Sequence, residues 1–220
     1  MDSRNFKKVG EWTTWRKLSD ELDPGDLVEM QRGPIQHWGV AIENFDGKVI
    51  IVHVTGDVGT GLGAVVGARK TVADIRVEEL SKAVGDCECR VNNAIDEEYE
   101  PFSTGMQVVR RGLSKIGEHT YDVWNYNCEH WASWCRNGNL VSRQAVAATE
   151  KLEEAKSAPK SKLGEIKEKV VADVEKLKAK LQAGPPPPPP PPEHIEIPPD
   201  VLEKLPFLKK FDKTKVDTAE

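Results

Sequence analysis

Residues 37–54, HWGVAIENFDGKVIIVHV, decide the fold, because two β-prone runs flank a turn signal there. The runs are HWGVAIE and KVIIVHV, and the segment 44–47 between them ends in Asp-Gly, which is typical of β-hairpins. His37 opens the first run, and His53 lies near the end of the second. A hairpin with an odd-numbered loop centred on Phe45 pairs these two histidines directly, so both imidazoles are expected on one face of a sheet.

Shorter elements surround this hairpin. LVEM at 27–30 predicts a strand after an Asp-Pro-Gly turn, and the pieces VADIRVEEL and CECRVN are β-prone. Residues 103–117 predict a helix, and so do residues 127–138, NCEHWASWCRNG, which start with an Asn cap and end at a glycine. A glycine-rich stretch, 56–67, lacks the spacing of a phosphate-binding loop and is interpreted as a loop.

Cys128 is the candidate nucleophile, since it follows Asn127 at the expected start of the last of these helices. The positive end of a helix favours a thiolate, and its amide groups can stabilise an oxyanion. Together, Cys128, His37 and His53 have the residue types of a nucleophile, its base and a group that orients the base. The alternative for Cys128 is a buried structural cysteine.

Zinc binding is the rival interpretation of the cysteines and histidines. Cys87 and Cys89 are separated by one residue, whereas structural zinc sites usually have two to four between paired cysteines. Cys135 lies two helical turns after Cys128, too far for a disulfide, and is expected in the core. His130 is expected to cap or pack the helix. We therefore expect no zinc site. The tryptophans near these residues predict either an apolar substrate channel or ordinary core packing.

Composition divides the 220 residues into four regions. Residues 1–145 hold all the Trp, Tyr and Cys and predict one folded domain. Residues 146–183 predict a charged helix with an amphipathic stripe from Leu163 to Leu181. Residues 184–199 contain an unbroken run of prolines and predict a polyproline linker, and 200–220 predict a flexible tail.

Charge and hydropathy exclude several classes of protein. The net charge of −5 argues against a nucleic-acid-binding protein. No apolar run has the roughly 18–20 residues needed to span a bilayer, so no transmembrane segment is expected. The first residues lack a secretory signal pattern, so we expect cytoplasmic localisation and reduced cysteines, with peripheral contact to membranes.

Several motifs in this order resemble the lecithin–retinol acyltransferase-like family. They are LDPGDLVEM, QHWGVAI, IIVHV, CRVNNAIDEEYEP and YNCEHWASWCRNG. Within the family the chain is most similar to the branch of HRAS-like suppressors, which are phospholipase A/acyltransferases. The resemblance implies an α+β fold of the circularly permuted NlpC- and papain-like kind, with an antiparallel sheet packed against helices and, in this chain, a helical and proline-rich C-terminal extension.

The resemblance also implies a mechanism. Cys128 is the nucleophile, His37 the base and His53 the third member of the catalytic group. The thiolate attacks an acyl ester of a glycerophospholipid at a membrane surface and forms a thioester, which then reacts with water, an amine or an alcohol. The mechanism that the resemblance implies needs no metal and no organic cofactor. The branch often carries a C-terminal hydrophobic anchor, in whose place this chain has the charged helix, the proline run and the tail.

Alternatives remain open at the level of sequence. The same fold serves thiol peptidases and amidases, and a non-enzymatic adaptor that uses the proline-rich tail is a third hypothesis. The amphipathic stripe fits a membrane surface or a partner helix equally, and the cluster FLKKF at 207–211 is a second candidate for membrane contact. The proline run fits a spacer or the ligand of a proline-recognition domain.

Overall fold

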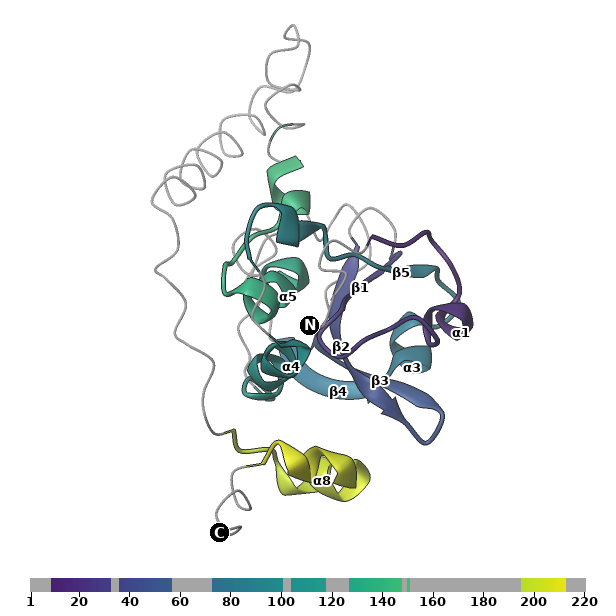
Figure 1. Cartoon of the computed structure of the whole chain (residues 1–220), viewed down its shortest axis with the longest axis vertical. Coiled ribbons are helices and arrows are strands. Elements are labelled where there is room, and N and C mark those ends of the chain that lie inside the picture. The colour runs from purple at the N-terminus through teal and green to yellow at the C-terminus, as the bar shows by residue number, and fades with distance from the viewer. Residues whose placement is uncertain are drawn as a thin grey trace, which may run out of the picture.

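The computed structural model describes residues 9–32, 36–56, 73–100, 104–117, 127–147, 150 and 195–212. Its centre is a five-stranded antiparallel sheet in the order β4-β3-β2-β1-β5 (Figure 1). The strands are β1 (Leu27–Met30), β2 (His37–Phe45), β3 (Lys48–Gly56), β4 (Ala73–Glu79) and β5 (Cys89–Val91). The helices are α1 (Trp15–Leu18), α3 (Leu80–Val84), α4 (Gly105–Leu113), α5 (Cys128–Asn137) and α8 (Pro199–Lys204), with 3₁₀ turns η1 (Ala94–Glu97) and η2 (Pro206–Lys210). The expected α+β architecture is confirmed.

Helices cover both faces of the sheet, which explains the nearly continuous apolar runs in β2 and β3. Val40 and Val52 belong to a cluster with the apolar residues of α4 and α5 on one face. Ala41 and Ile51, which alternate with them, pack with residues of α1 and α3 on the other face (Figure 1). The central hairpin is therefore held from two sides, and its ends are the places where polar side chains can gather.

The hairpin register differs from the sequence expectation. Its turn is the two residues Asp46 and Gly47, both with positive φ (52° and 72°), as in the primed turns that suit the twist of paired strands. If the strands continued from this turn without a bulge, His53 would pair with Val40, and the two histidines would lie on opposite faces of the sheet. A β-bulge between Ala41 and Glu43 shifts the register by one, so that His53 lies opposite Gly39. The direct pairing of His37 with His53 was therefore wrong, but the bulge returns both side chains to one face.

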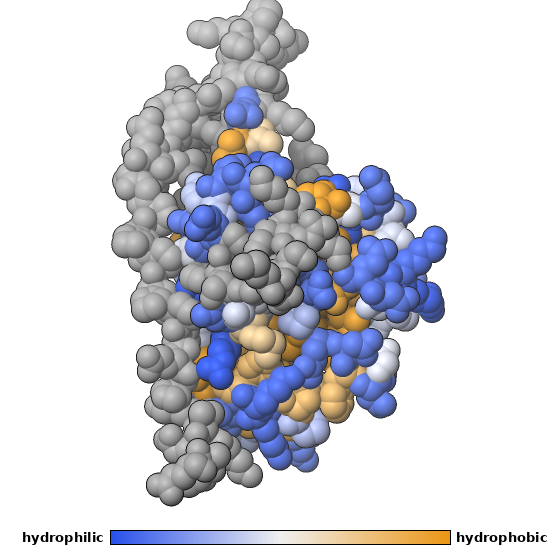
Figure 2. Space-filling view, viewed as in Figure 1, coloured by the Kyte–Doolittle hydropathy of each residue, from blue (hydrophilic) through white to orange (hydrophobic). Residues whose placement is uncertain are grey.

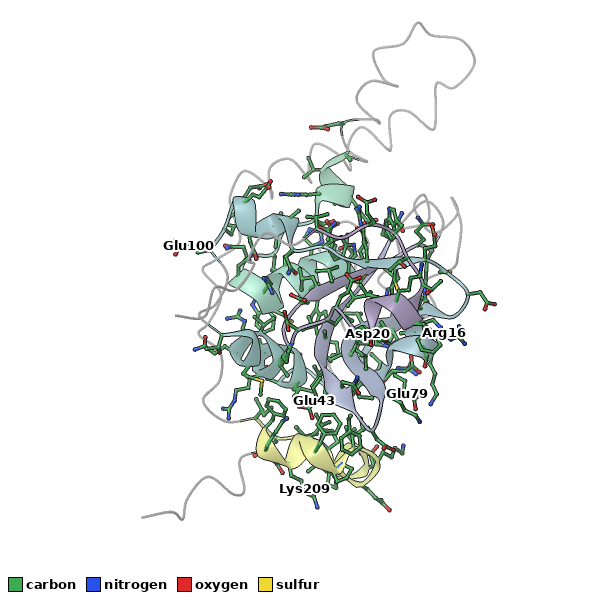
Figure 3. The ribbon with its side chains drawn as sticks, turned by 45° about the vertical axis from the view of Figure 1, so that its right-hand side comes forward. Arg16, Asp20, Glu43, Glu79, Glu100 and Lys209 are labelled. Carbon is green, nitrogen blue, oxygen red and sulfur yellow. The ribbon has the colours of Figure 1, made fainter. Side chains whose placement is uncertain are left out.

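Residues 195–212 pack against the domain near the tip of this hairpin. Phe207 stacks on Phe45 with ring centroids 4.6 Å apart, and Leu208 is fully buried. Lys210 pairs with Glu43, which lies on the side of the sheet that faces this segment (Figure 3). The segment differs from the flexible tail expected from sequence, because its apolar side chains, including those of the FLKKF cluster, complete the core around α4 and α5. The amphipathic stripe and the proline run lie outside the described residues.

In the described part of the chain, none of the helices is long and apolar enough to cross a membrane. The face of the molecule in Figure 2 is largely hydrophilic, and apolar side chains appear among the charged ones in its lower half.

Candidate active site

Cys128 occupies the first position of α5, as the sequence predicts. The side chain of Asn127 caps the helix by accepting hydrogen bonds from the amides of Glu129 and His130, at 2.9 and 3.0 Å. The imidazole of His130 accepts a bond from the Asn127 amide in return, at 3.3 Å, so this histidine has the expected capping role. The Cys128 side chain is buried, and its thiol donates to the backbone oxygen of Gln36 over 3.6 Å.

The structure brings His37 and His53 into direct contact. Nε2 of His37 lies 2.9 Å from Nδ1 of His53, and the rings meet edge to face with centroids 5.2 Å apart. The contact is diagonal across the two strands, because the residue opposite His53 is Gly39. A Cβ atom at position 39 would lie 3.2 Å from the His53 Cβ, so the glycine leaves room for the ring of His53.

The sulfur of Cys128 lies beside the start of β2, where it contacts the backbone of Gln36. Strand alternation puts the two imidazoles on the face opposite Trp38 and Val40, and α5 packs with Trp38 and Val40. A side chain on α5 therefore meets His37 only around the start of the strand. The contact between Cys128 and Gln36 lies there, at the residue directly before His37.

Glu78 on β4 is a residue that the sequence reasoning missed. Its Oε2 lies 3.3 Å from Nε2 of His53, on the side of the ring away from His37. The register of β3 and β4 pairs His53 with Arg76 and Ile51 with Glu78, which puts Glu78 on the histidine face. The only signal in the sequence is a pair of glutamates at the end of a β-prone run, and it does not say which of the two faces the histidines.

Burial dominates the electrostatics of this group. The pKa of His37 is well below its usual value of 6.5, because desolvation disfavours the imidazolium, with smaller contributions from His53 and Arg32. The pKa of His53 is also lowered by desolvation, which outweighs the opposing effect of Glu78. The pKa of the Glu78 carboxyl is lowered, chiefly by its interaction with His53. At neutral pH the two rings are therefore uncharged, and His37 can accept a proton.

A polar clamp holds the start of β2 beside α5. The Gln144 side chain accepts a bond from the Gln36 amide at 2.5 Å and donates to the Gln36 oxygen at 3.4 Å. Gln144 also donates to the carboxylate of Glu129 over 3.1 Å, and the Ser142 hydroxyl donates to the same carboxylate. The residue before His37 is therefore tied to the helix that carries Cys128.

The remaining cysteines have no comparable surroundings. Cys135 is completely buried and desolvation raises the pKa of its thiol, while burial raises the pKa of Cys89 to about 12. Cys87 is exposed, and all four cysteines are thiols rather than disulfides. Within the described ranges, no three His, Cys, Asp or Glu side chains gather as metal ligands would.

A cavity of about 350 Å³ lies beside the first turns of α5. Both apolar and polar side chains line it, including those of Leu27, Trp38, Arg90, Asn92, Ile95, Glu129, Arg143 and Gln144. The tryptophans that lie near Cys128 and His37 in the sequence are Trp38, Trp124, Trp131 and Trp134. Trp38 lines this cavity, whereas Trp131 and Trp134 pack in the core. Trp124 lies outside the described residues.

Comparisons to known proteins identify the family of this chain. The family model described as lecithin retinol acyltransferase matches residues 20–141, and the chain belongs to this family of acyl-transferring enzymes. Among curated relatives, the chain is 33% identical over 126 residues to phospholipase A and acyltransferase 1 of Rattus norvegicus, covering 57% of this chain and 74% of the relative. It is 32% identical over 130 residues to phospholipase A and acyltransferase 4 of Homo sapiens, covering 58% of this chain and 77% of that one. Residues 195–212, which pack on the domain, lie beyond the family match.

Proposed function

We propose that this protein is a cysteine-dependent phospholipase A and acyltransferase that acts on glycerophospholipids through a thioester acyl-enzyme. The observation that carries the proposal is a pair of contacts at the start of β2. His37 contacts His53, and the thiol of Cys128 contacts Gln36, the residue before His37. The names of the relatives supply the substrate class. The chemistry of the residues supplies the roles: a thiol nucleophile, a neutral imidazole base and a second imidazole that orients it.

The first half-reaction transfers the acyl group to sulfur. His37 takes the thiol proton of Cys128, and the thiolate attacks the ester carbonyl carbon of the phospholipid. The positive end of α5 stabilises the developing oxyanion. The ester C–O bond then breaks, and the lysophospholipid oxygen leaves with the proton held by His37.

The second half-reaction releases the acyl group. Water, an alcohol or an amine attacks the thioester carbonyl while His37 accepts its proton. The C–S bond breaks, and the proton returns to the sulfur of Cys128, which restores the starting state. Hydrolysis and transfer differ only in the acceptor, so both follow from one site and no cofactor takes part.

The finer description of the fold and location is part of the same proposal. We propose the circularly permuted NlpC- and papain-like form of this α+β fold for residues 1–145; the order of the chain, with both histidine strands before the cysteine helix, supports it. We also propose that the protein works in the cytoplasm at membrane surfaces, because its substrates are lipids. The proline run serves as a spacer or as a ligand for a proline-recognition domain.

Intact-mass spectrometry after incubation with phosphatidylcholine tests the mechanism. We expect an acyl adduct on the wild type that is absent from Cys128→Ala, together with loss of phospholipid turnover. Cys87→Ala is the matched control, because Cys87 is an exposed thiol whereas Cys128 is buried, and it should keep both the adduct and the turnover. Unchanged lipid turnover in Cys128→Ala would refute the proposal. Turnover of peptide or amide substrates but not of lipid would favour a thiol peptidase or amidase instead.

A further inference from the structure

We propose that Glu78 is a positioning residue that sets the tautomers of both imidazoles, leaving Nδ1 of His37 as the basic nitrogen of the site. The proposal rests on the function proposed above for Cys128 and His37. It adds Glu78, on strand β4, to the group of Cys128, His37 and His53 that the sequence predicts.

The contacts determine the tautomers one after another. A neutral imidazole has one N–H donor and one acceptor nitrogen, whereas an ionised carboxylate only accepts. Oε2 of Glu78 lies 3.3 Å from Nε2 of His53, at ion-pair distance but without the alignment of a hydrogen bond. The negative charge at this distance favours the hydrogen of His53 on Nε2, and its Nδ1 becomes an acceptor. Nδ1 of His53 lies 2.9 Å from Nε2 of His37, so the hydrogen of His37 is favoured on Nε2. The lone pair of His37 is then on Nδ1.

The position of the sulfur makes this tautomer the productive one. Nδ1 is bonded to Cγ and is the ring nitrogen nearer the main chain, whereas Nε2 of His37 is already occupied by His53. The thiol of Cys128 contacts the backbone oxygen of Gln36, on the main-chain side of His37. The opposite tautomer would put a hydrogen on Nδ1 and leave His37 unable to take the thiol proton.

The surrounding charges make the effect of Glu78 moderate. Glu78 faces His53 together with Arg76 from the same strand, and Arg32, on the loop after β1, acts on both rings. Glu78 is the only one of these three that favours an imidazolium. Its side chain is 30% exposed, and its 3.3 Å approach to Nε2 of His53 is an ion-pair contact rather than an aligned hydrogen bond. We therefore expect a smaller effect than that of a fully buried triad carboxylate.

Two substitutions distinguish the effect of the negative charge of Glu78 from that of its acceptor oxygen. Glu78→Gln keeps an acceptor oxygen and removes the charge, so we expect kcat to fall about tenfold and the acid limb of kcat/KM to move down by about 0.5–1 pH unit. Glu78→Ala removes the acceptor as well, and we expect a loss of about a hundredfold, with KM little changed. Glu79→Gln is the matched control. Glu79 is the next residue and contacts Lys48 and Lys82 at 3.1 and 3.3 Å, so this variant should keep the wild-type pH profile.

A second measurement does not depend on turnover. Nitrogen-15 NMR of the imidazoles should show the Nε2–H tautomer for both histidines in the wild type and in Glu79→Gln, and a tautomer mixture in Glu78→Ala. A wild-type His53 protonated on Nδ1, or full activity with an unshifted acid limb in Glu78→Ala, would overturn the proposal. If the wild type has no acyl turnover, the proposed function fails, while the tautomers still decide the role of Glu78.

Discussion

Gly39→Ala tests whether the empty position opposite His53 matters for the imidazole pair. A Cβ atom at this position would lie 3.1 Å from Cδ1 of Ile51, 3.2 Å from Cβ of His53 and 3.3 Å from the oxygen of Val52. These contacts are tight, so the neighbours must move by a few tenths of an ångström. The φ of Gly39 is not in the left-handed region, so the substitution adds no backbone strain.

The expected changes in stability and activity differ in size. Overpacking costs about 1 kcal/mol of unfolding free energy at this scale, and the lower chain entropy of Ala offsets about 0.5–1 kcal/mol of it. A displacement of His53 by a few tenths of an ångström stretches its 2.9 Å contact with His37. Since a misplacement of 1 Å costs about a hundredfold in rate, we expect kcat/KM to fall about three- to tenfold.

The assay is phospholipid hydrolysis measured beside urea unfolding of the same preparation. Gly10→Ala is the control, because a Cβ there meets only ordinary contacts at 3.7 Å and beyond, so it should change neither quantity. Full activity in Gly39→Ala would refute the idea that this glycine makes room for the imidazole pair. A stability loss above about 3 kcal/mol would show instead that the position serves folding.

Three further outcomes follow from the contacts. Unfolding free energy should fall as the pH drops from 6.5 to 5.5, by up to about 1.4 kcal/mol per pH unit for each histidine, because the folded-state pKa values of His37 and His53 lie below those of the unfolded chain. His37→Gln should reduce this dependence of stability on pH. A wild-type stability that does not change with pH would contradict the argument that burial lowers both pKa values. Leu208→Ala should cost about 2–5 kcal/mol in chemical denaturation, because the side chain is fully buried, whereas a loss under 0.5 kcal/mol would mean that the C-terminal segment does not stay packed. Gln144→Ala should lower kcat roughly tenfold, because it removes the bonds that tie Gln36 to Glu129. Wild-type activity in this variant would exclude a positioning role for the clamp.

Local signals were enough for the elements that carry the site. The Asn cap before Cys128 and the Asp-Gly turn between two Val- and Ile-rich runs act within a few residues, so the start of the helix and the existence of the hairpin are visible in the sequence. The family motifs add the order of the elements. Neither the local signals nor the motifs reveal the register of the hairpin, because no pattern of residues marks the bulge at Ile42. Whether a bulge forms there depends on how the strand packs against the helices on both faces of the sheet.

The amino-acid sequence by itself therefore determined that a thiol begins one helix and that two imidazoles belong to one hairpin. Only the tertiary structure decided the bulged register through which these imidazoles share a face, the contact of Glu78 with His53, and the packing of residues 195–212 at the hairpin tip. The physical reason is that capping and turn formation are local, whereas strand register and side-chain contacts between distant segments depend on which arrangement buries the apolar residues of every element together.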